Sequence, residues 1–255
     1  MKNARGVVGN SLLPILTVVF LFVLWQIAVK VTNTPVWFLP APSDIVQALA
    51  ERAYDLPRHT WATFYETVLG FGLAILVGVP LAAIVVSSKF ISSTVYPLIL
   101  ITQSIPKVAF APILLIWFGY GDLPKVIVVF LVAFFPVVVD TATGLMSPAP
   151  ELLELARQLS AKPWQVYAKI RFPSALPYFF SGLKVAITLA VIGAVIGEFV
   201  GSDIGLGYLV IVSTANFKTP MAFGAMAILA VMGIVLFYAI YAVERVMIPW
   251  YGRSE

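Results

Sequence analysis

Residues 154–173 read ELARQLSAKPWQVYAKIRFP, a composition unlike that of the rest of the chain. Five of these twenty side chains are charged, whereas charged residues make up 11% and hydrophobic residues 61% of the 255 residues. Long apolar runs lie before and after the stretch. A helix needs about 20 apolar residues to cross the hydrocarbon core of a bilayer. The stretch therefore predicts a polar loop between membrane-spanning helices.

The apolar runs place the whole chain in the membrane. Its mean hydropathy is +0.99, and a soluble protein of this length needs a more polar surface. The runs are continuous rather than alternating, which favours helices over the strands of a barrel. We predict an all-α polytopic membrane bundle of about six transmembrane helices, forming a single domain over residues 1–255. The expected spans are Leu12–Val31, Phe64–Ser88, Val95–Phe118, Leu123–Leu145, Leu176–Val200 and Met221–Val243.

The basic residues predict the orientation of the bundle. Lys2 and Arg5 precede the first span as in a signal peptide, but the apolar run is too long and no small-residue cleavage site follows, so we expect a retained helix. With the N-terminus in the cytoplasm, ten Lys and Arg fall on the cytoplasmic side and five outside. This bias predicts that both termini and residues 154–173 are cytoplasmic. The basic residues of this topology also explain the pI near 9.3. The sequence shows no basic face exposed to water, so a nucleic-acid partner is not expected.

The charged stretch has the pattern of a helical hairpin over residues 150–173. Leu152, Leu155, Ala156 and Leu159 share one face, and a helix starting near Glu151 places its early glutamates where the helix dipole favours anions. Residues 160–162 break the pattern, and a second helix is expected to start at Pro163 and to end before Pro173. The hairpin either caps the bundle or docks a soluble partner.

A second amphipathic segment is expected outside the membrane, over residues 42–56. Ser43 or Asp44 is a plausible N-cap, and Ile45, Ala48, Leu49 and Arg52 fall on one stripe. This helix either lies at the outer membrane surface or packs on the bundle.

Polar residues inside the spans are candidates for a transport path. Three prolines, Pro97, Pro106 and Pro112, predict kinks in the third span, and broken helices occur both along transport paths and for packing alone. Lys107 either contacts an anionic substrate, snorkels, or pairs with Asp140 or Glu198. The glycines of residues 197–207 allow tight packing or a re-entrant turn. The pathway candidates are Gln103, Lys107, Asp140 and Glu198.

Two other function classes, a secondary transporter and a membrane enzyme, would each depend on few residues. A secondary transporter driven by an ion gradient could use Asp140 and Glu198 as its coupling site. A membrane enzyme is implausible, because the chain has no Cys and a single His, so neither a metal cluster nor a nucleophile–His pair is expected. His59 is expected to be a solvated residue of the outside loop.

The spacing of the hairpin resembles the EAA loop of the permease subunits of bacterial ABC importers, whose motif reads E-A-A, three residues, G, nine residues, I-x-L-P. Here Glu154-Leu155-Ala156, Ser160 and IRFP at 170–173 keep that spacing, with Leu155, Ser160 and Phe172 as departures. Ser160 in place of Gly implies either that the turn needs no positive φ or that serine tolerates one at some cost. The resemblance covers about residues 35–250 and extends to the branch for nitrate, sulfonate, taurine, bicarbonate and thiamine-precursor uptake. It does not identify the substrate.

The resemblance implies an importer subunit of the bacterial inner membrane. Two copies, most simply a homodimer, would form the path, with an ATPase subunit on the cytoplasmic side and a periplasmic or lipid-anchored binding protein outside. The sequence has no GxxxxGK[ST] loop, so ATP would be bound by the partner and no cofactor by this chain. We expect Leu155, Leu159 and Trp164 to be buried against the ATPase, with Arg157 and Lys162 at the rim. The implied coupling residues are Glu154, Leu155, Ala156, Arg157, Leu159, Ser160, Lys162 and Trp164.

Overall fold

Every regular element of the described residues, 4–250, is a helix in the computed structural model. The prediction of an all-α membrane bundle is therefore confirmed. In chain order the elements are α1 (Ala4–Val31), α2 (Pro42–Glu51), α3 (Leu56–Ser87), α4 (Lys89–Thr102), the 3₁₀ turn η1 (Lys107–Phe110), α5 (Ala111–Phe118), α6 (Asp122–Met146), α7 (Pro150–Gln158), α8 (Pro163–Val166), the π-helical segment η2 (Tyr167–Arg171), α9 (Phe172–Gly201), α10 (Leu206–Ala215) and α11 (Thr219–Met247).

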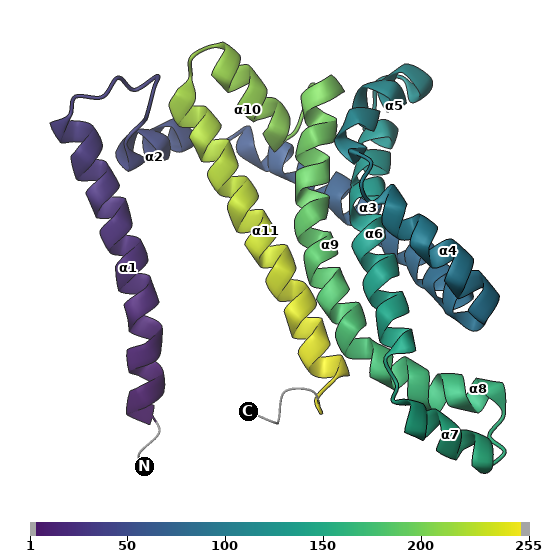
Figure 1. The fold of residues 1–255 in the computed structure, drawn as a ribbon. Helices are drawn as coiled ribbons and strands as arrows, with labels where there is room; N and C mark the ends of the chain where they lie inside the picture. Colours follow the sequence, from purple (N-terminus) through teal and green to yellow (C-terminus); the bar gives the residue numbers. More distant parts are fainter. Residues whose placement is uncertain (1–3, 251–255) are drawn as a thin grey trace.

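The core of the bundle lies between α3, α6 and α9 (Figure 1). Small side chains let these helices approach closely, as is usual in membranes where close van der Waals packing drives association. At Gly70 of α3, an added Cβ would lie 2.4 Å from the Cβ of Val129 on α6. Phe71 and Phe180 fill the centre of the same cluster. Since these three helices are fixed by packing, they form the frame that holds the polar sites.

Among residues 4–250, five of the about six expected spans have a counterpart long and apolar enough to cross a membrane, if the broken third span is counted as one. Within the part of the chain that the structure describes, four unbroken segments are long and apolar enough to cross a membrane: Leu56–Ser87, Asp122–Met146, Pro163–Gly201 and Thr219–Met247. The third expected span is broken, since residues 90–102 and 107–118 meet at 76°. The kink predicted from its prolines is thus confirmed. The first expected span falls in the 28-residue α1, where the apolar stretch counted, Leu16–Val31, is shorter than a full span.

The two ends of the bundle differ in what they carry. The start of α1, the end of α11 and the α7–α8 hairpin lie at one end, and α2, α5 and α10 lie at the other (Figure 1). α1 stands apart from the core and is held mainly at its far end, where Gln26 Nε2 donates to Ser43 Oγ at 2.9 Å. At the hairpin end, Lys184 of α9 pairs with Glu244 of α11 at 2.9 Å. The start of α1, the end of α11 and the hairpin thus share one end of the bundle, and the side of the membrane that this end faces stays a prediction.

α2 packs on the bundle. Ile45 is 8% exposed, and Leu49 packs against Gly224 of α11, which favours the packed alternative over a helix lying free at the surface. The predicted N-cap is wrong: Ala41 occupies that position, because Pro42 already takes the first helical place. Asp44 instead accepts the Ala41 N–H at 3.1 Å from the third position.

Candidate functional site

The residues 150–173 form the predicted hairpin at one end of the bundle (Figure 1). α7 starts at Pro150, one residue before the predicted start. α8 starts at Pro163 as predicted, and the Lys162 N–H donates to Gln165 Oε1 at 2.8 Å. The side chain of Gln165 therefore binds the backbone just ahead of α8, in the manner of a capping box.

The turn of the hairpin is built around Ser160. Its φ is +52°, a left-handed conformation. The Ser160 N–H donates to the Arg157 carbonyl at 2.9 Å, and the Ala161 N–H donates to the Ala156 carbonyl at 2.9 Å. These two bonds make a Schellman motif, in which the left-handed residue is usually glycine. Of the two alternatives from the sequence, serine tolerating a positive φ at some cost is the one observed.

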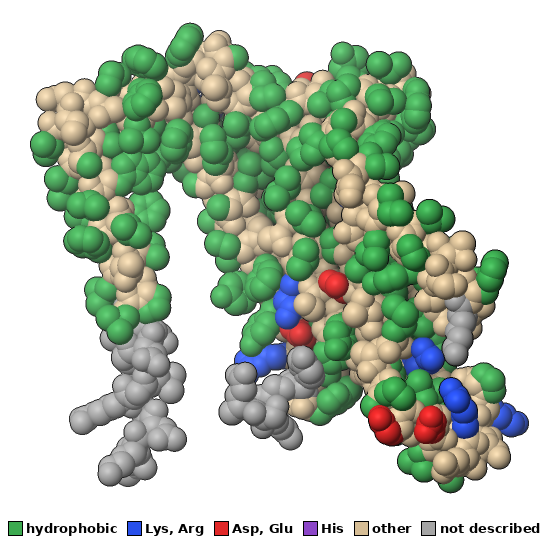
Figure 2. Space-filling model, viewed as in Figure 1, with side chains coloured by type: hydrophobic (Ala, Val, Ile, Leu, Met, Phe, Trp, Pro, Cys, Tyr) green, Lys and Arg blue, Asp and Glu red, His purple; other side chains and the backbone are tan. Residues whose placement is uncertain are grey.

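The hairpin presents apolar side chains to its surroundings. Leu155 is 51%, Leu159 73% and Trp164 62% exposed, whereas Ala156 is 6% exposed and faces inward. A cavity of about 350 Å³ lies between the two arms, with Leu152, Leu155 and Ile170 in its wall. Charged side chains gather around this end of the molecule, while the coloured side chains elsewhere on this face are almost all hydrophobic (Figure 2). An apolar groove rimmed by charges suits a soluble protein partner better than lipid.

The second arm of the hairpin does not end before Pro173, so that prediction is wrong. α8, η2 and α9 form one helical segment, Pro163–Gly201, of 39 residues. In a regular α-helix the ring of Pro173 would clash with the carbonyl four residues earlier. The π-helical turn at Tyr167–Arg171 widens the backbone just before it. Arg171 Nη1 also donates to the Leu145 carbonyl at 2.9 Å, which ties the arm to the end of α6.

The broken span holds the candidates Gln103 and Lys107. Gln103 is exposed at the end of α4, and Lys107 is half-buried at the start of η1. Lys107 Nζ donates to the Gln103 carbonyl at 2.8 Å and sits 4.4 Å from the centre of the Phe135 ring. Within the described residues it pairs with neither Asp140 nor Glu198. Asp140 lies half-buried on α6 beside Gly182 of α9.

A buried ion pair links α3 and α6 at the end opposite the hairpin. Lys125 donates to Glu66, and it also pairs with Asp122 at 3.1 Å. Glu66 is 1% and Lys125 3% exposed. The second oxygen of Glu66, Oε2, has no protein partner within the described residues. Lys125 further donates to Ser202 Oγ at 3.3 Å, at the end of α9.

A second buried group binds the start of α10; we call it the α10 latch and define it as His59, Thr63, Glu198 and the backbone of 205–207. Thr63 Oγ1 donates to Glu198 Oε1 at 2.6 Å and accepts the Leu206 N–H at 2.8 Å. Glu198 Oε2 accepts the Gly207 N–H. Glu198 is 2% exposed, so this pathway candidate is enclosed by protein.

His59 belongs to the α10 latch, and the prediction of a solvated loop residue is wrong. It lies on α3 and is 7% exposed. Its Nδ1 accepts the Gly205 N–H at 3.0 Å, and its Nε2 lies 3.2 Å from Asp55 Oδ2. Nδ1 also lies 3.1 Å from the Gly205 carbonyl oxygen. With the proton on Nε2, facing the Asp55 carboxylate, Nδ1 is the acceptor for the Gly205 N–H. Gly205 has φ +123°, and a Cβ there would lie 2.2 Å from Glu198 Cδ, so only glycine fits.

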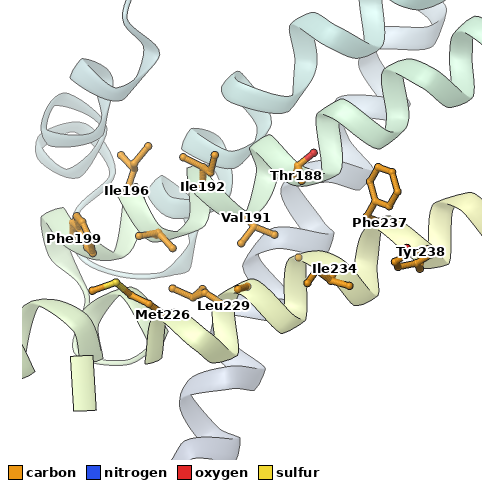
Figure 3. A pocket seen from close by; sticks show the side chains of 13 residues that line it. Thr188, Val191, Ile192, Ile196, Phe199, Met226, Leu229, Ile234, Phe237 and Tyr238 are labelled. Carbon is orange, nitrogen blue, oxygen red and sulfur yellow. The ribbon is translucent and has the colours of Figure 1, made fainter. Parts of the chain in front are cut away.

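A large apolar cavity, about 730 Å³, lies between α9 and α11 (Figure 3). Val191, Phe199, Leu229 and Phe237 are among its walls, and none of its lining side chains is charged. Its polar side chains are the hydroxyls of Thr188 and Tyr238, so it offers no opposite charge to an ion.

Comparison with known proteins decides the family. Residues 70–253 match the model of the binding-protein-dependent transport system inner membrane component. The chain belongs to this family. It is 38% identical to a probable ABC transporter permease of Haemophilus influenzae, covering 89% of this chain and 93% of that one. It is 36% identical to the formylaminopyrimidine transport permease ThiX of Halalkalibacterium halodurans, over 94% and 96% of the two chains.

Two further proteins are similar at lower identity, one in sequence and one in fold. The taurine transport permease TauC of Escherichia coli is 27% identical, over 93% of this chain and 88% of that one. A chain of the inward-facing MetNI methionine ABC transporter superposes with a TM-score of 0.67 at 19% identity, covering 77% of this permease and 97% of that chain. That likeness supports the helical membrane fold of the permease.

Sequence reasoning missed the buried polar groups of this permease. Glu66 and Lys125 are 59 residues apart in the chain, and nothing in the local pattern around either residue points to the other. His59 stands beside Arg58 and Thr60, which makes it resemble a polar loop residue. The one available signal was the number of polar residues facing one side of the first turns of α3, since His59, Thr63, Glu66 and Thr67 are all buried there.

Proposed function

We propose that this permease forms, as a homodimer in the bacterial inner membrane, the substrate path of an ATP-driven importer. A separate ATPase subunit docks at the α7–α8 end, which is cytoplasmic together with both chain ends. A periplasmic or lipid-anchored binding protein delivers substrate at the end that carries α2 and α10. The observation that carries this proposal is the hairpin, whose exposed apolar face lies at the end of the bundle, apart from its long apolar sides.

The hairpin has the properties of a docking element. Leu155, Leu159 and Trp164 would be buried in a groove of the ATPase, and large aromatic and aliphatic anchors dominate the energy of such contacts. Glu154, Arg157 and Lys162 are exposed around them and would form the rim, where charges set orientation more than affinity. Ala156 is buried inside the hairpin, and Ser160 forms its turn with a positive φ. Closure of the two ATPases can shift the permease only as far as they bind its states with different affinity.

The transport path is proposed to run along the broken span. An unpaired ammonium does not face lipid at low cost, so the surface around Lys107 is covered by the second copy or lined by water. Because a twofold axis repeats each residue, two Lys107 side chains would border the path, with Gln103 nearby. Asp140 is the remaining half-buried carboxylate of the proposed path, whereas Glu198 is enclosed in the α10 latch.

Energy and specificity are assigned to the partners. The printed sequence holds no GxxxxGK[ST] motif, so we propose that ATP is bound by the ATPase and that this chain has no catalytic activity and no cofactor. The relatives carry different substrates in their names, formylaminopyrimidine and taurine among them. We propose that the binding protein selects the solute.

Reconstitution tests the proposal. The permease is co-purified with its ATPase and binding protein, placed in liposomes, and assayed for uptake with ATP inside or outside. Uptake that requires both ATP on the hairpin side and the binding protein on the other side is expected. Uptake driven by a proton or sodium gradient without ATP would instead establish an ion-coupled secondary transporter.

A further inference from the structure

Three consecutive backbone N–H groups open α10, and side chains of other helices accept all three. His59 accepts from Gly205 at 3.0 Å and Thr63 accepts from Leu206 at 2.8 Å. Glu198 accepts from Gly207. The first N–H groups of a helix have no partner within it and are usually satisfied by a local cap or water. The position of α10 is therefore set by α3 and α9.

The side chains of the α10 latch are buried, so water cannot easily replace their hydrogen bonds. Thr63 is 0%, Glu198 2% and His59 7% exposed. Loss of one side chain would leave a buried donor or acceptor unpaired, and that is more costly than the loss of an exposed bond. Glu198 also places a carboxylate at a helix N-terminus, where the dipole favours it. The arrangement thus favours one seated position of α10.

One helical segment carries both the α10 latch and the hairpin. Pro163–Gly201 runs without interruption from Trp164 in the hairpin to Glu198 in the latch. Through Thr63, the latch also holds α3, which packs along α6 over much of its length. A displacement of the hairpin therefore has a continuous rigid element through which it reaches α10.

We propose that His59, Thr63 and Glu198 are positioning residues that make α10 move together with α3 and α9 during the ATP cycle. Their action keeps ATP hydrolysis coupled to transport. The inference depends on the proposed function, because it assumes that the hairpin is moved by an ATPase. It adds the residues by which that motion reaches the far end of the path.

A thiol-labelling experiment tests the latch without a known substrate. The chain contains no cysteine, so Leu209→Cys on α10, at a position 2% exposed, is the only thiol of the permease. The full complex with its ATPase, in nucleotide-free and vanadate-trapped forms, is treated with N-ethylmaleimide. We expect protection in both states. Adding Thr63→Val should raise the labelling rate roughly tenfold, as loss of a buried hydrogen bond implies, and Thr63→Ser should restore protection.

A matched control separates a local from a global effect. Ala186→Cys lies in the core of α9 and is 0% exposed, and its protection should not change with Thr63→Val. Unchanged labelling at Leu209→Cys would overturn the proposal, as would equal loss of protection at both positions.

The coupling role is measured on the same variants. In liposomes, Thr63→Val should keep ATP hydrolysis while uptake of the solute that the unmodified complex accumulates falls, so that more ATP is hydrolysed per solute. An unchanged ratio would contradict the coupling role. If the unmodified complex accumulates nothing with ATP, the proposed function fails instead, and the labelling result still decides whether the latch holds α10.

Discussion

Lys125 of α6 donates a hydrogen bond to Glu66 of α3 where both side chains are almost excluded from solvent, at 3% and 1% exposure. Removing one member leaves the other charge buried without its partner, which costs about 3–5 kcal/mol. We therefore expect Lys125→Met to lower the unfolding temperature of the purified permease strongly. The measurement is thermal unfolding in detergent.

The double variant Glu66→Gln with Lys125→Met is the control for that pair. Replacing both charges avoids the unpaired partner, so its loss of stability should be smaller than that of Lys125→Met alone. A double variant at least as unstable as the single one would show that the pair itself adds net stability. The comparison therefore measures what this contact between α3 and α6 contributes to stability.

The sequence predicted the elements of this permease better than its polar contacts. Long apolar runs and prolines are local signals, so the spans, the kink and the start of α8 could be read directly. The end of the second arm could not be predicted, because no local sequence pattern indicates the π-helical turn that accommodates Pro173. The pairing of Glu66 with Lys125 arises only when α3 packs on α6.

Gly205→Ala should prevent correct seating of α10. The φ of +123° is unfavourable for alanine, and the new Cβ would meet Glu198 Cδ at 2.2 Å. We expect loss of folded protein or a large fall in thermal stability. Gly72→Ala is the matched control, since a Cβ there meets nothing within 4 Å, and a helical Gly-to-Ala change is stabilising by roughly 0.5–1 kcal/mol. Equal behaviour of the two variants would contradict the close packing at Gly205.

Ser160→Gly should stabilise the turn of the hairpin. Serine at φ +52° bears a left-handed strain of about 1–2 kcal/mol. Glycine removes this strain, but it loses more conformational entropy on folding, which offsets part of the gain. The expected net gain is up to about 1 kcal/mol, seen as slower proteolysis between α7 and α8. Gln158→Gly, at the last position of α7, should act in the opposite direction because glycine weakens helices. Faster cleavage of Ser160→Gly would refute the assigned strain.

Trp164→Ala should weaken assembly with the ATPase more than the stability of the permease. The indole is 62% exposed in the isolated chain, so little folding energy depends on it, whereas aromatic anchors at interface centres often contribute about 2 kcal/mol or more. We expect at least a tenfold weaker association, which corresponds to about 1.4 kcal/mol, measured by titrating the ATPase onto permease in nanodiscs. Val246→Ala, at another exposed apolar position (81%) outside the hairpin, should leave affinity unchanged.

Lys107→Gln tests the proposed path. Its ammonium is bound only by the Gln103 carbonyl and the face of Phe135 among the described residues, so its loss breaks no ion pair and should not unfold the bundle. If two copies of Lys107 border the path, uptake should fall roughly tenfold, equivalent to about 1.4 kcal/mol, while ATPase binding stays intact. Lys107→Arg keeps the charge and should retain most of the uptake. Lys218→Gln, at an exposed lysine between α10 and α11, serves as the control for loss of charge. Full uptake by Lys107→Gln would remove Lys107 from the path and leave the bend at residues 103–106 as a packing feature.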